Sequence, residues 1–134
     1  MAWNNLGSAL RSVGRTEEAI GAHNRARDLF QAAGDRHREG RTWNNLGLTL
    51  EKAGRVEEAI KAYDKCLELY WEFKDWYGTG QTLHNLALAH EAAYRPVEAR
   101  TAYLQAADAF TRADAPTEAA RVRARAAELD APSP

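Results

Sequence analysis

The stretch Trp43-Asn44-Asn45-Leu46-Gly47 decides the fold, because the same five residues occur forty positions earlier as Trp3-Asn4-Asn5-Leu6-Gly7. Forty positions later the stretch returns in altered form as Leu83-His84-Asn85-Leu86-Ala87. The same spacing relates Glu17-Glu18-Ala19-Ile20 to Glu57-Glu58-Ala59-Ile60. Self-similarity at a period of about 20 to 50 residues indicates a chain built from stacked repeats.

Composition narrows the class of protein. At 134 residues the chain has the length of one domain, so the repeats are expected to share one core. The net charge of -1 gives no general attraction to nucleic acid or to an anionic membrane, and neither is expected as a partner. No apolar run approaches the ~20 residues that span a bilayer, and no secretory signal is visible. We therefore expect a soluble, cytoplasmic protein.

Residues with catalytic or metal-binding chemistry are sparse and scattered. The four histidines, His23, His37, His84 and His90, lack the HExxH spacing of a zinc site and do not pair with Cys66. The single cysteine excludes an intrachain disulfide and is interpreted as a buried small side chain. No enzyme activity, metal or cofactor is expected.

The middle copy contains the pattern of two helices. Trp43, Leu46, Gly47 and Leu50 have the spacing of one helix face, which predicts a first helix from about Arg36 to Gly54. Asp35 is a plausible N-cap, and a glycine at 54 can adopt the left-handed conformation that closes a helix. The predicted second helix begins near Glu57, and its apolar face contains Ala59, Tyr63, Cys66, Leu67 and Tyr70. The short connection makes the two helices antiparallel neighbours.

The other copies repeat this helix pair with changes. In the third copy Tyr94 replaces the glycine at the turn, and Pro96 falls in the first turn of the next helix, where its missing N–H is tolerated. A last, mostly polar helix begins around Pro116 and is interpreted as a cap. The predicted organisation is one domain over 1–130, with repeats at about 1–34, 35–74 and 75–114, a capping helix at about 115–129 and a disordered tail at 130–134.

The first repeat is shorter at its start than the second. Only two residues precede Trp3, whereas about seven separate Asp35 from Trp43. The chain is therefore interpreted as a fragment of a longer array whose N-terminal side is open. An open side could bind a second copy of the chain, so a self-assembling repeat fragment is the alternative to a module that binds other proteins.

The pattern that recurs within the chain resembles that of the tetratricopeptide repeat family. The resemblance is to the variety with forty-residue repeats found in bacterial signalling and regulatory arrays. The matching residues of the middle copy are Trp43, Leu46, Gly47, Leu50, Ala59 and Tyr63. The first copy departs from the pattern at His23, where an aromatic residue is usual. The resemblance implies an all-α solenoid of antiparallel helix hairpins, coiled as a right-handed superhelix. It also implies a concave groove, lined by the first helix of each repeat, that binds an extended peptide or a partner helix.

Helix geometry separates the packing face of each first helix from a second face roughly opposite to it. The family architecture implies that this second face lines the groove. The expected groove residues are Asn4, Asn5, Ser8, Arg11, Arg41, Asn44, Asn45, Leu48, Lys52, Gln81, His84, Asn85 and Leu88. Asn5, Asn45 and Asn85 form a ladder of amides that can bond the backbone of an extended peptide. Alternatively, each amide bonds a neighbouring helix or water.

One known ligand of the family is not expected. Chaperone-binding members hold a peptide carboxylate with two Lys, one Arg and two Asn, and the corresponding residues are Asn4, Ser8, Asn45, Gln81 and Asn85. Only Asn45 fits, so a strong clamp for a free carboxylate is not predicted. The expected function is a protein-interaction module of a larger regulatory or scaffold protein, with a protein or peptide as its partner.

An aromatic stretch distinguishes the second repeat from the first. Trp71, Trp76 and Tyr77 stand where the first repeat has Gln31, Arg36 and His37. Exposed aromatic patches can mark interfaces, although packing between repeats is an equally good interpretation.

Overall fold

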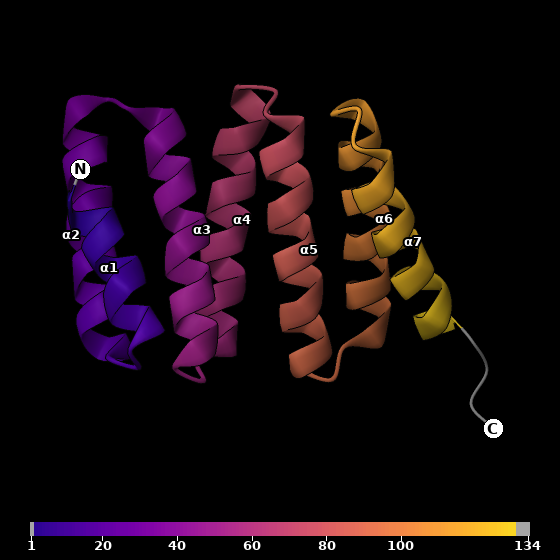
Figure 1. Ribbon diagram of the computed structural model, residues 1–134, viewed down its shortest axis with the longest axis horizontal. Helices are drawn as coiled ribbons and strands as arrows, with labels where there is room; N and C mark the ends of the chain where they lie inside the picture. The colour runs from indigo at the N-terminus through magenta and orange to yellow at the C-terminus, as the bar shows by residue number, and fades with distance from the viewer. Residues whose placement is uncertain (1, 131–134) are drawn as a thin grey trace. The chain divides into compact units, whose positions relative to one another are not determined.

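The computed structural model describes residues 2–130, which form seven helices and no strand (Figure 1). The helices are α1 Ala2–Ser12, α2 Thr16–Ala33, α3 Arg36–Lys52, α4 Val56–Glu72, α5 Trp76–Ala92, α6 Pro96–Arg112 and α7 Pro116–Asp130. The prediction of an all-α fold of helix hairpins is confirmed. The predicted tail lies outside the described residues except for Asp130, which ends α7.

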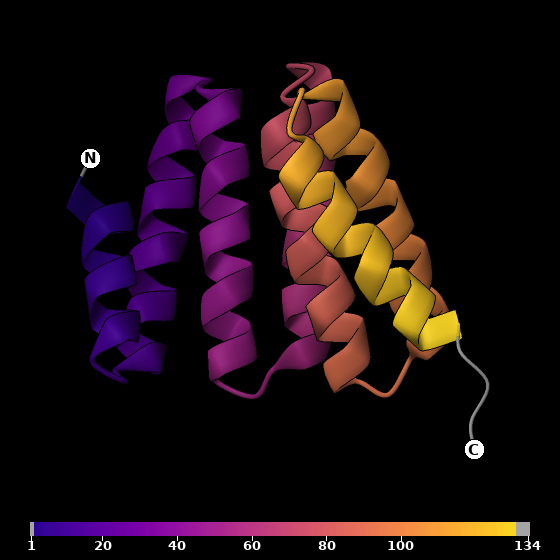
Figure 2. The same cartoon turned by 45° about the vertical axis from the view of Figure 1, so that its right-hand side comes forward.

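The helices group into two compact units, Met1–Leu69 and Tyr70–Pro134, with the boundary inside α4. In the first unit, α1 packs on α2 and α2 packs on α3. In the second unit, α6 packs on both α5 and α7, and Figure 2 shows α7 crossing in front of α6. Each unit has its own core, built around Tyr63 in the first and Tyr103 in the second. The single-domain organisation stays a prediction.

Left-handed residues close the helices at a spacing of twenty positions. Three are glycines, Gly14, Gly34 and Gly54, and three carry side chains, Lys74, Tyr94 and Asp114. Gly54 ends the first helix of the middle repeat as predicted, with φ 79°. Tyr94 adopts the same conformation with φ 60°, so the third repeat keeps the turn geometry without the residue that suits it best.

Close approach of paired helices depends on small residues. A Cβ at position 47 would overlap the Tyr63 ring, so α3 and α4 can pack this closely only because residue 47 is glycine. Gly80 has the same relation to Phe110, whose Cδ1 would lie 2.7 Å from an added Cβ. Gly47 of α3 therefore lies directly against the Tyr63 ring of α4.

Aspartates begin two of the helices. Asp35 accepts a hydrogen bond from the backbone N–H of Arg38 at 3.2 Å, as predicted for the N-cap of α3. Asp75 accepts one from the Gly78 N–H at 2.9 Å and caps α5 in the same way. These bonds satisfy N–H groups that otherwise lack a partner at a helix start.

Candidate functional site

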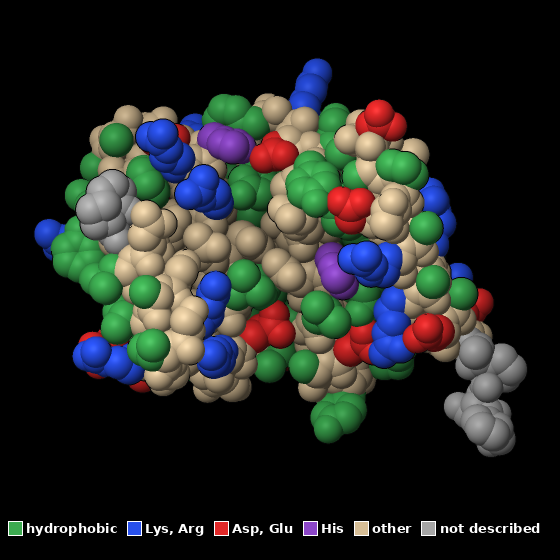
Figure 3. Space-filling view, in the orientation of Figure 1, with side chains coloured by type: hydrophobic (Ala, Val, Ile, Leu, Met, Phe, Trp, Pro, Cys, Tyr) green, Lys and Arg blue, Asp and Glu red, His purple; other side chains and the backbone are tan. Residues whose placement is uncertain are grey.

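The predicted groove residues of the first unit lie on α1 and α3. Figure 3 shows uncharged polar side chains and backbone, drawn in tan, over these two helices. Asn5, Arg41 and Lys52 are exposed, whereas Ser8, Arg11, Asn44, Asn45 and Leu48 are half-buried. Within residues 2–130, the side-chain amides of Asn5 and Asn45 form no hydrogen bond. These eight residues are called the α1–α3 face below.

Asn4 does not belong to this face, which corrects the prediction. It is buried, and its amide N–H donates to Thr42 Oγ1 at 3.2 Å. Its carbonyl oxygen accepts from Nδ1 of His23 at 2.9 Å. His23 replaces the tyrosine of the later repeats, and an imidazole in the core needs a polar partner. Asn4 therefore serves the packing of the first repeat.

Two cations lie together at one end of the α1–α3 face. An Nη1–H of Arg11 donates to the backbone oxygen of Asn45 at 3.4 Å, and Lys52 Nζ donates to the backbone oxygen of Arg11 at 2.8 Å. Neither cation forms an ion pair with any carboxylate of the described residues. The nearby Glu51 is half-buried and bonded to Tyr63, and burial raises the pKa of its carboxyl. This end of the face therefore offers positively charged donors.

The predicted residues of the second unit lie on α5. Gln81 and Leu88 are exposed, whereas His84 and Asn85 are half-buried. The His84 ring lies against Tyr103 at 5.8 Å between centroids. Burial, with a contribution from the Arg121 charge, lowers the pKa of His84, so the imidazole is neutral at pH 7.

Arg125 of α7 is a residue of this surface that the prediction missed. It pairs with Glu91 of α5 and with Glu128 of its own helix. Residue 125 lies forty positions after Asn85, so α7 carries an arginine in the register of the asparagine ladder. The forty-residue register could have identified it, but the helix lacks the Trp-Asn-Asn signature and was interpreted only as a cap.

The three aromatic residues singled out at the end of α4 and the start of α5 divide into two contacts. Trp71 is 60% exposed and meets the half-buried Trp76 edge to face at 4.9 Å. The Arg112 guanidinium lies over both rings, 4.8 Å from the Trp76 centroid and 5.9 Å from that of Trp71. Tyr77 instead donates to Glu118 at 2.8 Å. The two tryptophans thus form a surface cluster that excludes Tyr77, and its role as an interface stays a prediction.

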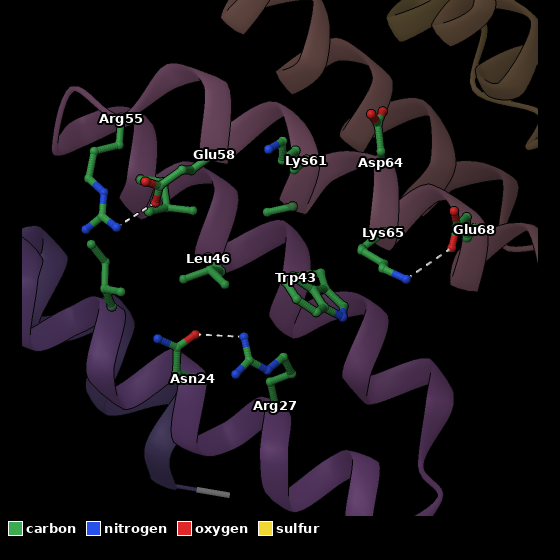
Figure 4. Close-up of a pocket in the computed structure, with 13 residues that line it drawn as sticks. Asn24, Arg27, Trp43, Leu46, Arg55, Glu58, Lys61, Asp64, Lys65 and Glu68 are labelled. Atoms are coloured by element: carbon green, nitrogen blue, oxygen red, sulfur yellow. Dashed lines mark hydrogen bonds and ion pairs between the residues drawn. The ribbon is translucent and has the colours of Figure 1, made fainter.

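A hollow of about 540 Å³, also missed from the sequence, lies on the first unit between α2 and α4 (Figure 4). Trp43, Leu46 and Leu50 of α3 line its floor. The α2 side contributes Ile20, Asn24 and Arg27, and Figure 4 shows Arg27 beside Trp43, with its guanidinium 5.0 Å from the ring centroid. The other side is a charged rim of residues 55–68. Trp43, predicted as a core residue, is therefore only half-buried.

These arrangements supply polar, cationic and aromatic surfaces. Among the described residues, no group of three His, Cys, Asp or Glu could hold a metal ion. Nor is any described helix long and apolar enough to cross a membrane.

Comparison with known proteins identifies the repeat. A sequence profile described as tetratricopeptide repeat matches residues 1–70 and again 38–112. The chain belongs to the tetratricopeptide repeat family. Tetratricopeptide repeats are generally protein–protein interaction modules, and this is the function class that membership gives.

Solved structures share the fold of this tetratricopeptide repeat chain, and one of them illustrates the likeness. The crystal structure of BtubC (BKLC) from P. vanneervenii matches with a TM-score of 0.72 and 14% sequence identity. The match covers 98% of this chain and 65% of the BtubC chain, so this chain spans about two thirds of BtubC. No curated protein matches the sequence.

Proposed function

We propose that the protein binds an extended peptide segment of a partner protein on the α1–α3 face. The observation that carries this proposal is the pair of asparagines, Asn5 and Asn45, whose amides form no hydrogen bond within residues 2–130. Asn45 lies in the middle of α3, where asparagine has poor helix propensity, so its presence there needs a reason other than helix stability. An amide that can both donate and accept suits the C=O and N–H of an extended backbone.

The surroundings of the two asparagines support a peptide rather than a small molecule. Arg11 and Lys52 provide donors for backbone carbonyls or acidic side chains at one end of the face. Leu48 lies three residues beyond Asn45 and provides a half-buried apolar contact for a ligand side chain. A small, mostly polar surface of this kind fits weak and transient recognition.

A selection from a random peptide library displayed against the full chain tests the proposal. Enriched peptides should bind in roughly the micromolar range, and Asn5→Ala with Asn45→Ala should weaken them about tenfold, since two hydrogen bonds are lost. The thermal midpoint should stay nearly unchanged, because neither amide bonds another described residue. As a matched control, Asn24→Ala on α2 should leave peptide affinity unchanged. Enriched peptides that bind the double variant as tightly as the original would contradict the proposal.

A further inference from the structure

The corner between α4 and α5 exposes large aromatic side chains. Trp71, in the last turn of α4, is 60% exposed, and Phe73 in the turn that follows is 49% exposed. Trp76, the first residue of α5, meets Trp71 edge to face. Exposed aromatic side chains that adjoin one another mark interaction surfaces, whereas isolated ones need no explanation.

Arg112 adds hydrogen-bond donors to this pair of rings. It lies in the last turn of α6, and its guanidinium is over both indoles, closer to Trp76 than to Trp71. Figure 1 shows the start of α5 and the end of α6 at the same end of the second unit. A guanidinium that lies over an aromatic ring keeps the N–H groups at its edge available for hydrogen bonds. The two indoles therefore hold a planar fork of donors in place.

Two cations of this corner lack a carboxylate partner. Within residues 2–130, the side chains of Lys74 and Arg112 form neither an ion pair nor a hydrogen bond. Two carboxylates of the second unit that lie near the corner have partners of their own. Asp75 accepts the N–H that it caps at the start of α5, and Glu118 accepts from the Tyr77 hydroxyl. The corner therefore combines exposed indole surface with two unpaired positive charges.

The repeat fold does not require these features. In the forty-residue register, the positions of Trp71, Lys74 and Trp76 hold Gln31, Gly34 and Arg36 in the first repeat. Lys74 adopts the left-handed conformation, with φ 52°, that glycine adopts at position 34. This conformation is unfavourable for a residue with a Cβ, so turn geometry does not account for the lysine.

We propose that Trp71, Lys74, Trp76 and Arg112, called the corner site, bind an acidic linear segment of a partner protein. One carboxylate of the segment accepts two hydrogen bonds from the Arg112 fork, and a second carboxylate pairs with Lys74. An apolar residue between them packs on the exposed Trp71 ring. Proline suits this position best, because it has little side-chain entropy to lose on binding.

Charge and position favour this occupant over others. The corner joins two described helices, so neither end of the sequence causes its exposure. A second copy of the chain is a poor source of carboxylates, because many on its surface already pair within their own helices, among them Glu18, Glu58, Glu68 and Glu128. Single-stranded RNA also binds exposed indoles and cations, but the net charge of -1 supplies no general attraction to it.

A peptide selection on the full chain tests the corner site. The probe is a displayed library in which two glutamates lie on each side of three random positions. Before each round, peptides that bind an Arg112→Gln chain are removed, which eliminates peptides that bind elsewhere. We expect enrichment of proline or aliphatic residues at the random positions. The enriched peptides should bind in roughly the micromolar range by fluorescence anisotropy, and more weakly as salt is added.

Variants that take no part in the selection decide where the peptides bind. Trp71→Ala should weaken binding at least about tenfold, and Lys74→Gln about threefold. Arg112→Lys keeps the charge but loses the planar fork, so it should also weaken binding severalfold. The matched control is Arg41→Gln, which removes an exposed positive charge from the α1–α3 face and should leave affinity unchanged. Thermal melts should show that every variant folds.

Four results would overturn the proposal. The first is a selection that enriches no peptide, and the second is equal binding by the Trp71→Ala chain. The third is a labelled oligouridine that binds as tightly as the peptides and is also lost in Trp71→Ala, which would assign the corner to RNA. The fourth is self-association in light scattering that Trp71→Ala abolishes, which would assign it to a second copy.

The corner site and the α1–α3 face belong to different units, so the two binding proposals can be separated. The double variant Asn5→Ala with Asn45→Ala should leave the affinity of the corner-site peptides unchanged. Loss of their binding in this double variant would place them on the α1–α3 face and contradict the corner site alone.

Discussion

The Tyr63 hydroxyl donates a hydrogen bond of 2.5 Å to Oε1 of Glu51, which ties the second helix of the middle repeat to the end of its first helix. The pair recurs in the second unit, where Tyr103 donates to Glu91. Each tyrosine lies 12 residues after its glutamate. The contact therefore recurs in the second and third repeats and links the two helices of each of these hairpins.

The variant Tyr63→Phe should lower the free energy of unfolding by about 1 to 2 kcal/mol, because the half-buried Glu51 carboxylate loses its donor. Urea denaturation measures the change. The variant Tyr103→Phe is the matched control and should cost less, since Arg125 continues to pair with Glu91. A loss for Tyr103→Phe equal to or greater than that for Tyr63→Phe would contradict this account.

The helices of this protein were predictable because the same pattern of apolar and small residues occurs in each of the three repeats. Gly47 and Tyr63 both belong to the repeat pattern, and in the structure they face each other. Asp35 caps α3 and Pro116 begins α7, also as expected, because caps and prolines act through local backbone chemistry. Local backbone chemistry and the forty-residue spacing together were sufficient to predict these helices.

Burial at the candidate surfaces was less predictable, because identical residues have different neighbours. Leu6 and Leu46 belong to identical pentapeptides, yet the first is largely exposed and the second is buried under α2. Asn4 was predicted to face a ligand by its register. In the structure Asn4 is buried instead and bonds His23, which stands where the later repeats have tyrosine. The burial of Leu6 and Asn4 depends on contacts between residues of different helices. The spacing of residues along one helix gives no information about such contacts.

Tyr94→Gly should stabilise the protein by roughly 0.5 to 1 kcal/mol, because a left-handed conformation is unfavourable for a residue with a Cβ. The side chain is 92% exposed, so its removal loses little packing. The converse change, Gly54→Ala, should destabilise by about 1 to 2 kcal/mol at the equivalent turn. Chemical denaturation of both variants provides the check. A Tyr94→Gly protein less stable than the original would show that the Tyr94 ring makes a contact of its own.

Trp43→Ala should destabilise by about 3 kcal/mol, because the ring is half-buried between α2 and α4 and stacks with Arg27. Trp3→Ala should cost only about 1 kcal/mol, since the Trp3 ring is 40% exposed. The two changes are chemically identical and differ only in what covers the ring. Equal losses in thermal or urea unfolding would mean that α2 contributes nothing to the burial of Trp43.

His23 should make the protein sensitive to acid. Burial, and secondarily the charge of Arg11, lowers the pKa of His23 from 6.5 to about 4 in the folded state. Between these two values the unfolded chain binds a proton that the folded chain does not, so stability falls as the pH is lowered from about 6.5 toward about 4. The contribution of this one residue reaches about 3 kcal/mol at most.

Comparison with His23→Phe isolates that contribution from the carboxylates, which titrate in both proteins. The variant keeps an aromatic ring against Gly7 but cannot take up a proton, although it leaves Asn4 without one hydrogen bond at every pH. The difference in unfolding free energy between the two proteins should therefore be largest at pH 7 and shrink as the pH approaches about 4. Stability curves that stay parallel across this range would show that His23 is protonated as readily in the folded protein as in the unfolded chain.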